Sequence, residues 1–148
     1  MLADEVVGAW ELVSFTAERP GDPGVSYPLG PDAAGIIMYT ADGYMSAQIM
    51  RPGRHDYDPF DGGGDDVAQA AAAATGYLAY SGPYTADEAT RTLHHDVSVS
   101  LLPRWLNTVQ IREAALDGDQ LTLAEDDTLP AGPIRFALIW KRAAPADH

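Results

Sequence analysis

The chain has 148 residues, a formal net charge of −13 and no cysteine. Its length suits a single domain, and its acidic excess argues against binding to nucleic acid or to anionic membrane surfaces. Without cysteine there can be no disulfide, thiolate metal site or cysteine nucleophile.

The N-terminal segment does not resemble a signal peptide, because it carries Asp4 and Glu5 and lacks both a basic start and an apolar run. No stretch of the sequence approaches the roughly 18 apolar residues that a membrane-spanning helix needs. We therefore expect a cytoplasmic protein that does not bind membranes.

Short runs rich in β-branched and aromatic residues, separated by Gly, Pro and Asp, predict an all-β fold. The first three strands are expected over residues 6–16, 35–40 and 44–50. Asp42-Gly43 predicts a hairpin between the second and third strands, because this pair tolerates the positive φ angles of tight hairpin turns.

A Pro- and Gly-rich loop is expected over residues 51–65, followed by an Ala-rich helix over 67–75. Asp65 or Asp66 is expected to cap this helix, and Gly76 to end it.

Five more strands are expected over residues 76–84, 90–101, 107–116, 120–124 and 134–141. Eight strands are the number that closes a barrel just wide enough for a small ligand. The sequence therefore predicts an eight-stranded antiparallel β-barrel, one domain over residues 1–148, with the short helix across one barrel mouth. Residues 1–5 and 143–148 are expected to be frayed.

Several motifs resemble those of a known family. Gly8-Ala9-Trp10 matches the Gly-x-Trp signature of lipocalins, and Trp140-Lys141-Arg142 resembles their closing strand, whose basic side chain packs over that first tryptophan. More specific are these segments: Tyr27-Pro28-Leu29-Gly30-x-Asp32, residues 35–39, Asp42-Gly43-Tyr44-Met45-Ser46, Tyr80-Ser81-Gly82-Pro83-Tyr84, His94-His95, Trp105 and Gln110-x-Arg112. Over nearly its whole length the chain is similar to the small bacterial and fungal lipocalin-like domain family.

The resemblance implies a ligand-binding barrel. Related barrels in natural-product pathways act as cyclases or isomerases on polyketide- or terpenoid-like chains. The glycine-rich loop and the Ala-rich helix depart from the family pattern and would change any lid over the barrel.

The strand over 90–101 has the clearest alternation, which places five residues on the inward face: Leu93, His95, Val97, Val99 and Leu101. His95 is then a polar group among apolar neighbours, able to hydrogen-bond or exchange a proton with a ligand. The alternative is a core histidine whose partner is another protein group or water.

Gln110 and Arg112 share one face of the strand over 107–116. If that face lines the lumen, Arg112 can bind a carboxylate, enolate or carbonyl. If Ile111 and its face point inward instead, Arg112 is a surface charge. We favour the lumen, because an apolar lining with a few convergent polar groups is typical of a small-molecule site.

The hairpin over 35–50 has two faces, which we group as Ile37, Tyr39, Ser46 and Gln48 against Met38, Met45, Ala47 and Ile49. The second group is the expected general lining. Aromatic residues fill the barrel or line it, and packing is the alternative for each of them. The predicted ligand-binding set is Tyr39, Met45, Tyr80, His95, Val97, Trp105, Gln110, Arg112, Phe136 and Leu138. Trp10 beneath Lys141 or Arg142 is expected to plug the closed end of the barrel by cation–π stacking.

No metal or cofactor is predicted. His94 and His95 are neighbours in a strand and point to opposite faces, and His55 with Asp56 and Asp58 lacks a ligand spacing.

Three functions remain open from the sequence. The barrel is a carrier or sensor of a small hydrophobic metabolite, or a cofactor-independent cyclase or isomerase. In the enzyme, His95 is the acid or base, and Arg112, Gln110 or a tyrosine polarises a carbonyl. A weaker hypothesis is a structural partner that dimerises through the Ala-rich helix, so a monomer or a homodimer is expected.

Overall fold

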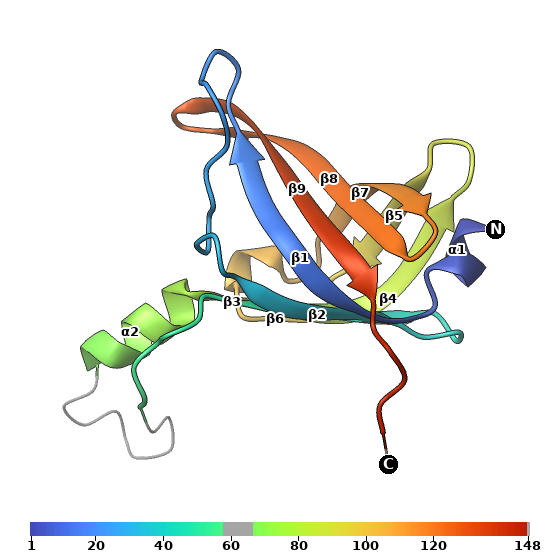
Figure 1. Cartoon of the computed structure of the whole chain (residues 1–148), viewed down its shortest axis with the longest axis horizontal. Helices are drawn as coiled ribbons and strands as arrows, with labels where there is room; N and C mark the ends of the chain where they lie inside the picture. Colours follow the sequence, from blue (N-terminus) through green and yellow to red (C-terminus); the bar gives the residue numbers. More distant parts are fainter. Residues whose placement is uncertain (58–66, 148) are drawn as a thin grey trace.

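The computed structural model describes residues 1–57 and 67–147 (Figure 1). In this part of the chain, nine antiparallel strands form one sheet in the order β3-β2-β1-β9-β8-β7-β5-β4-β6, and an additional β3–β4 pairing closes eight of them into a barrel. The strands are β1 (Gly8–Glu18), β2 (Ala34–Tyr39), β3 (Tyr44–Met50), β4 (Tyr77–Asp87), β5 (Thr92–Asp96), β6 (Val99–Ser100), β7 (Val109–Asp117), β8 (Gln120–Leu129) and β9 (Gly132–Arg142). The predicted eight-stranded barrel is confirmed.

The strand expected over 90–101 is broken in two. β5 ends at Asp96, and the short strand β6 pairs with Tyr80 and Ser81 of β4, on the edge opposite to β3. After β5, the backbone crosses close over Gly82 of β4. A Cβ built on Gly82 would lie 1.7 Å from the carbonyl oxygen of Asp96. Because the alternation stops at this crossing, Val99 and Leu101 do not point into the barrel as predicted but are 62% and 39% exposed.

The strand expected over 120–124 is too short. β8 continues to Leu129 and pairs with β9 as far as the Leu129–Gly132 pair, next to a tight turn. The acidic run Glu125-Asp126-Asp127 suggested a loop, yet alternation continues through it. Glu125 therefore takes the inward position that follows Leu121 and Leu123.

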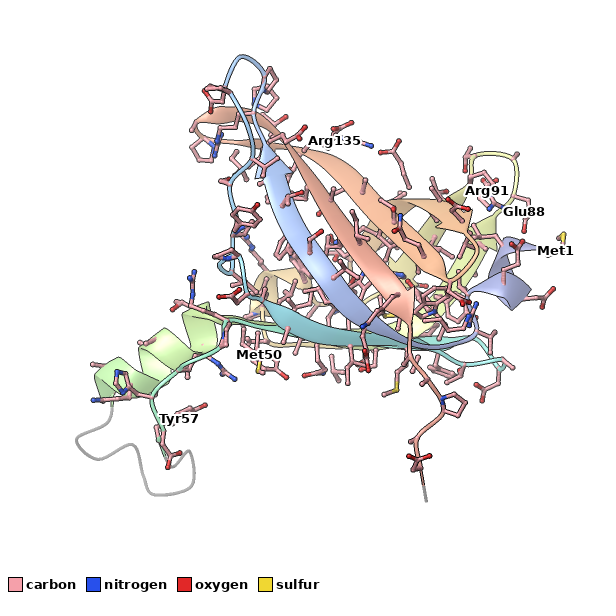
Figure 2. All side chains as sticks on the ribbon, in the orientation of Figure 1. Met1, Met50, Tyr57, Glu88, Arg91 and Arg135 are labelled. Atoms are coloured by element: carbon pink, nitrogen blue, oxygen red, sulfur yellow. The ribbon has the colours of Figure 1, made fainter. Side chains whose placement is uncertain are left out.

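One end of the barrel is plugged by the N-terminal segment, which forms helix α1 (Leu2–Glu5) where fraying was expected. Leu2 and Val6 are fully buried, so apolar burial holds the segment in place. The Leu2 amide also donates to Glu88, near the N-terminus in Figure 2.

Trp10 lies beneath this plug and donates from Nε1 to the Val6 carbonyl at 2.9 Å. The Arg142 guanidinium lies 4.2 Å from the Trp10 ring centre and donates to the carbonyls of Glu5 and Val7 at 2.8 and 3.0 Å. The predicted cation–π plug is confirmed, with Arg142 rather than Lys141 as the cation.

Helix α2 (Val67–Thr75) lies at the other end, near Met50 where β3 ends (Figures 1 and 2). It projects beside the barrel instead of lying across the mouth, and only Ala73 among its residues is buried. The predicted caps Asp65 and Asp66 lie outside the described residues. None of the helices described is long and apolar enough to cross a membrane.

Candidate ligand-binding site

The β2–β3 hairpin sends its odd-numbered residues into the barrel. Its register pairs Tyr39 with Met45 and Ile37 with Ala47, because the turn between the strands is four residues long. The grouping expected from the sequence is therefore wrong: Tyr39 and Ile37 share the inward face with Met45 and Ala47, while Met38 is 48% exposed. The closing β3–β4 ladder keeps this face turned toward the lumen.

A cavity of about 320 Å³ lies inside the barrel, at the small end of the range for ligand pockets. Inward side chains of seven strands line it, together with the 3₁₀ turn Pro103–Trp105. The lining consists of Phe15, Ile37, Ala47, Ile49, Leu78, Tyr80, Leu102, Arg104, Trp105, Gln110, Arg112, Leu123, Glu125, Asp127, Leu129, Phe136, Leu138 and Trp140.

The predicted binding residues fall into two groups. Those that line the cavity are Tyr80, Trp105, Gln110, Arg112, Phe136 and Leu138. Tyr39, Met45, His95 and Val97 are buried in the adjoining core and are not among the lining residues.

Two larger hollows, each of about 610 Å³, lie on the outer surface. One follows outward residues of β2 and β3, including Met38, and the other lies beside the β8–β9 turn. Their linings include many exposed side chains, whereas the internal cavity lies inside the barrel and is the better candidate site.

Arg112 forms the polar centre of the cavity. It is 5% exposed and faces the lumen, whereas Ile111 on the opposite face of β7 is 50% exposed. Its Nη1 donates to Glu125 Oε2 at 2.7 Å, and its guanidinium carbon lies 5.8 Å from the Trp105 ring centre. Gln110 accepts a longer bond from Nη2, at 3.4 Å. The one cation buried among the described residues thus already has a carboxylate partner.

Glu125 was not predicted as a site residue. Burial raises the pKa of its carboxyl group, and the neighbouring Asp127 acts in the same direction while Arg112 opposes both. Period-two alternation extended beyond Leu123 would have identified Glu125 from the sequence. The arginine partner was not predictable, because it lies on another strand.

His95 lies between two tyrosine hydroxyls. Its Nε2 is 2.8 Å from Tyr39 Oη, and its Nδ1 is 2.8 Å from Tyr80 Oη. The histidine is fully buried, and this burial lowers its pKa to about 3, helped by the charges of Arg112 and His94. His95 is therefore neutral at physiological pH, and its two partners are those of a satisfied core histidine.

The two tyrosines are also un-ionised. Burial raises the pKa of Tyr39 well above its ordinary value and also raises that of Tyr80, while the charge of Arg112 opposes the rise at both tyrosines. The hydroxyl hydrogens stay in place, so Tyr80 presents a neutral phenol at the cavity wall.

Metal ligation finds no support in the described ranges, where no three His, Asp or Glu side chains lie close enough to hold an ion. His94 points away from His95 and lies 3.0 Å from the Thr92 hydroxyl. His55 is described, but Asp58 of the same loop lies outside the described residues.

Comparison with known proteins agrees with this geometry. The sequence pattern of the lipocalin-like domain family matches residues 7–143, which span the whole barrel. A protein of Aspergillus oryzae (strain ATCC 42149 / RIB 40), named 4'-hydroxy-3'-methoxypropiophenone carrier protein ppsC, is 37% identical over 108 residues. The matched region covers 66% of this chain and 96% of the fungal protein.

Proposed function

Because the chain belongs to the lipocalin-like domain family, we propose that it is a carrier that holds a small, neutral and largely apolar molecule inside its barrel. The observation that supports this most strongly is the internal cavity, which has apolar walls and one polar cluster around Arg112. The name of the fungal relative, a carrier protein, points in the same direction.

The charges of the lining favour a neutral guest. The cavity lining contains two arginines, Arg104 and Arg112, and two carboxylates, Glu125 and Asp127, so the formal charges of the lining cancel. A carboxylate ligand would lose its hydration without gaining a free buried cation, because Arg112, the buried arginine of the lining, already binds Glu125. Long-chain fatty acids and other carboxylates are therefore poor candidates.

The walls of the cavity favour an aromatic guest. Trp105 meets Tyr80 edge-on with ring centres 5.2 Å apart, and Phe15 lies 6.1 Å from Phe136. Such rings offer flat apolar surfaces that stack on other rings. Since the fungal relative is named for an aromatic ketone, we propose that this chain carries a ketone of the same class.

The test is a calorimetric titration of the purified protein with 4'-hydroxy-3'-methoxypropiophenone. Saturable binding with one site per chain is expected. Trp105→Ala removes an aromatic wall and is expected to weaken binding about tenfold, which corresponds to about 1.4 kcal/mol. The matched control is Leu106→Ala, which changes an exposed neighbour outside the cavity lining and leaves binding unchanged. No saturable binding, or equal losses in both variants, would contradict the proposal.

One observation favours a second candidate, a cofactor-independent isomerase. Glu125 lines the cavity with a raised pKa, beside a guanidinium that can stabilise an enolate oxygen. Such a pair can remove a proton next to a carbonyl group. Incubating the protein with propiophenone in heavy water tests this activity: an isomerase exchanges the hydrogens next to the carbonyl, and Glu125→Gln abolishes the exchange. Binding without exchange would support the carrier function and reject the isomerase.

A further inference from the structure

The hydrogen bonds around His95 leave one tyrosine hydroxyl hydrogen without a partner. A neutral imidazole has one N–H donor and one acceptor nitrogen. Between Tyr39 and Tyr80, it can donate to one hydroxyl oxygen and accept from the other hydroxyl. The tyrosine that accepts from His95 must direct its own hydrogen elsewhere.

Tyr39 has no second acceptor available among the described residues, because its hydroxyl makes a single hydrogen bond, to His95. It is 2% exposed and does not line the cavity. If Tyr39 accepted from His95, its hydrogen would be buried without a partner, which is an expensive arrangement. Tyr39 therefore donates to Nε2, and His95 carries its proton on Nδ1.

Tyr80 then accepts from Nδ1–H, and its own hydrogen must point away from His95. The nearby Arg112 cannot take it, because a guanidinium only donates hydrogen bonds. Glu125 accepts from Arg112 and makes no hydrogen bond to Tyr80 within the described part of the chain. Tyr80 lines the cavity, unlike Tyr39 and His95, which leaves the cavity as the direction open to its hydrogen.

We propose that Tyr80 donates its hydroxyl hydrogen into the cavity and thereby selects ligands that carry a carbonyl-type acceptor oxygen. Tyr39 and His95 are positioning residues, which set the direction of this donor without contacting the ligand. The ligand half of the proposal rests on the carrier function proposed above, whereas the direction of the hydrogen bonds does not.

The direction can be measured without any ligand. In a ¹⁵N-labelled wild-type protein, long-range ¹H–¹⁵N correlation spectra distinguish the protonated ring nitrogen of His95 from the unprotonated one. We expect the proton on Nδ1. A proton on Nε2 would mean that Tyr80 donates to His95, and this would overturn the proposal.

The selectivity is measured with two probes of similar shape, propiophenone and propylbenzene, which differ in the carbonyl group. The ratio of their affinities removes the shared apolar contribution. Tyr80→Phe is expected to lower the preference for the ketone about fivefold, the usual effect of one lost hydrogen bond. An unchanged ratio in this variant would overturn the proposal.

Tyr39→Phe tests the positioning role. Without the Tyr39 hydroxyl, nothing holds the His95 proton on Nδ1, so the spectra should show both tautomers and the ketone preference should fall partway. Tyr84→Phe is the matched control: its hydroxyl bonds to the Thr40 carbonyl and not to His95, so tautomer and preference stay unchanged. A Tyr39→Phe protein with the wild-type tautomer and preference would contradict the role.

Failure of the two proposals can be told apart. If neither probe binds the wild-type protein, the carrier function and its selectivity are both rejected, while the spectra still decide the direction of the hydrogen bonds. If both probes bind and Tyr80→Phe leaves their ratio unchanged, the carrier function stands and only this inference fails.

Discussion

Acid should destabilise this protein through His95 in particular. Burial holds the pKa of His95 at about 3 in the folded protein, against the ordinary value of 6.5 in the unfolded chain. Between these values the unfolded chain binds a proton that the folded protein does not. The contribution of His95 to the free energy of unfolding is therefore fully present above pH 6.5 and falls as the pH drops toward 3.

The size of the effect follows from the width of this window. Each pH unit inside it changes the free energy of unfolding by about 1.4 kcal/mol. Lowering the pH by about two units from 6.5 should therefore reduce the free energy of unfolding by about 3 kcal/mol. This is a large part of the stability of a domain of this size.

Urea unfolding at several pH values measures this cost. The reference is His95→Gln, whose amide keeps one donor and one acceptor group for the two tyrosines but does not titrate. Subtracting the two series removes the contribution of the carboxylates that both proteins share. The advantage of the wild type over His95→Gln should shrink by about 1.4 kcal/mol per pH unit below the ordinary histidine pKa. A constant difference would refute the reasoning, because it would mean that the pKa of His95 is not lowered by folding.

Two further variants test the architecture. Gly82→Ala would place a Cβ 1.7 Å from the Asp96 carbonyl oxygen, so the two strands must move apart there. We expect the free energy of unfolding, measured with urea, to fall by about 1–3 kcal/mol. An unchanged midpoint would contradict the close contact. Arg142→Gln removes the stacking on Trp10 and two hydrogen bonds to backbone carbonyls, at an expected cost of about 1–2 kcal/mol. The control Lys141→Gln alters a mostly exposed side chain and is expected to leave the midpoint unchanged, so equal losses in the two variants would contradict the plug.

The strands were predictable wherever one face is buried and the other meets water. In β5, Leu93 and His95 are fully buried while Asp96 is exposed, as the alternation predicts. The prediction failed beyond Val97, which is still buried, because the alternation is interrupted near the backbone crossing at Gly82. The local sequence does not predict this crossing, because the crossing depends on contacts between two different strands.

Parts of the candidate site were also predictable. The composition of β7 suggested that Arg112 is in the lumen, and the structure places it there. Its partner Glu125 was missed, because an acidic run at the end of an expected strand is more typical of a loop. Local sequence gave no sign that this carboxylate pairs with a cation thirteen positions away on the neighbouring strand.

The sequence by itself determined the class of fold, since alternating side chains, turn residues and the Gly-Ala-Trp start specify enough strands to close a barrel. It also determined that His95 is buried, because its neighbours on the same strand face are apolar. Only the tertiary structure decided which groups surround His95 and Arg112. Ring closure brings residues of β2, β4, β5, β7 and β8 together, and the charge and hydrogen-bonding capacity of the cavity depend on those contacts.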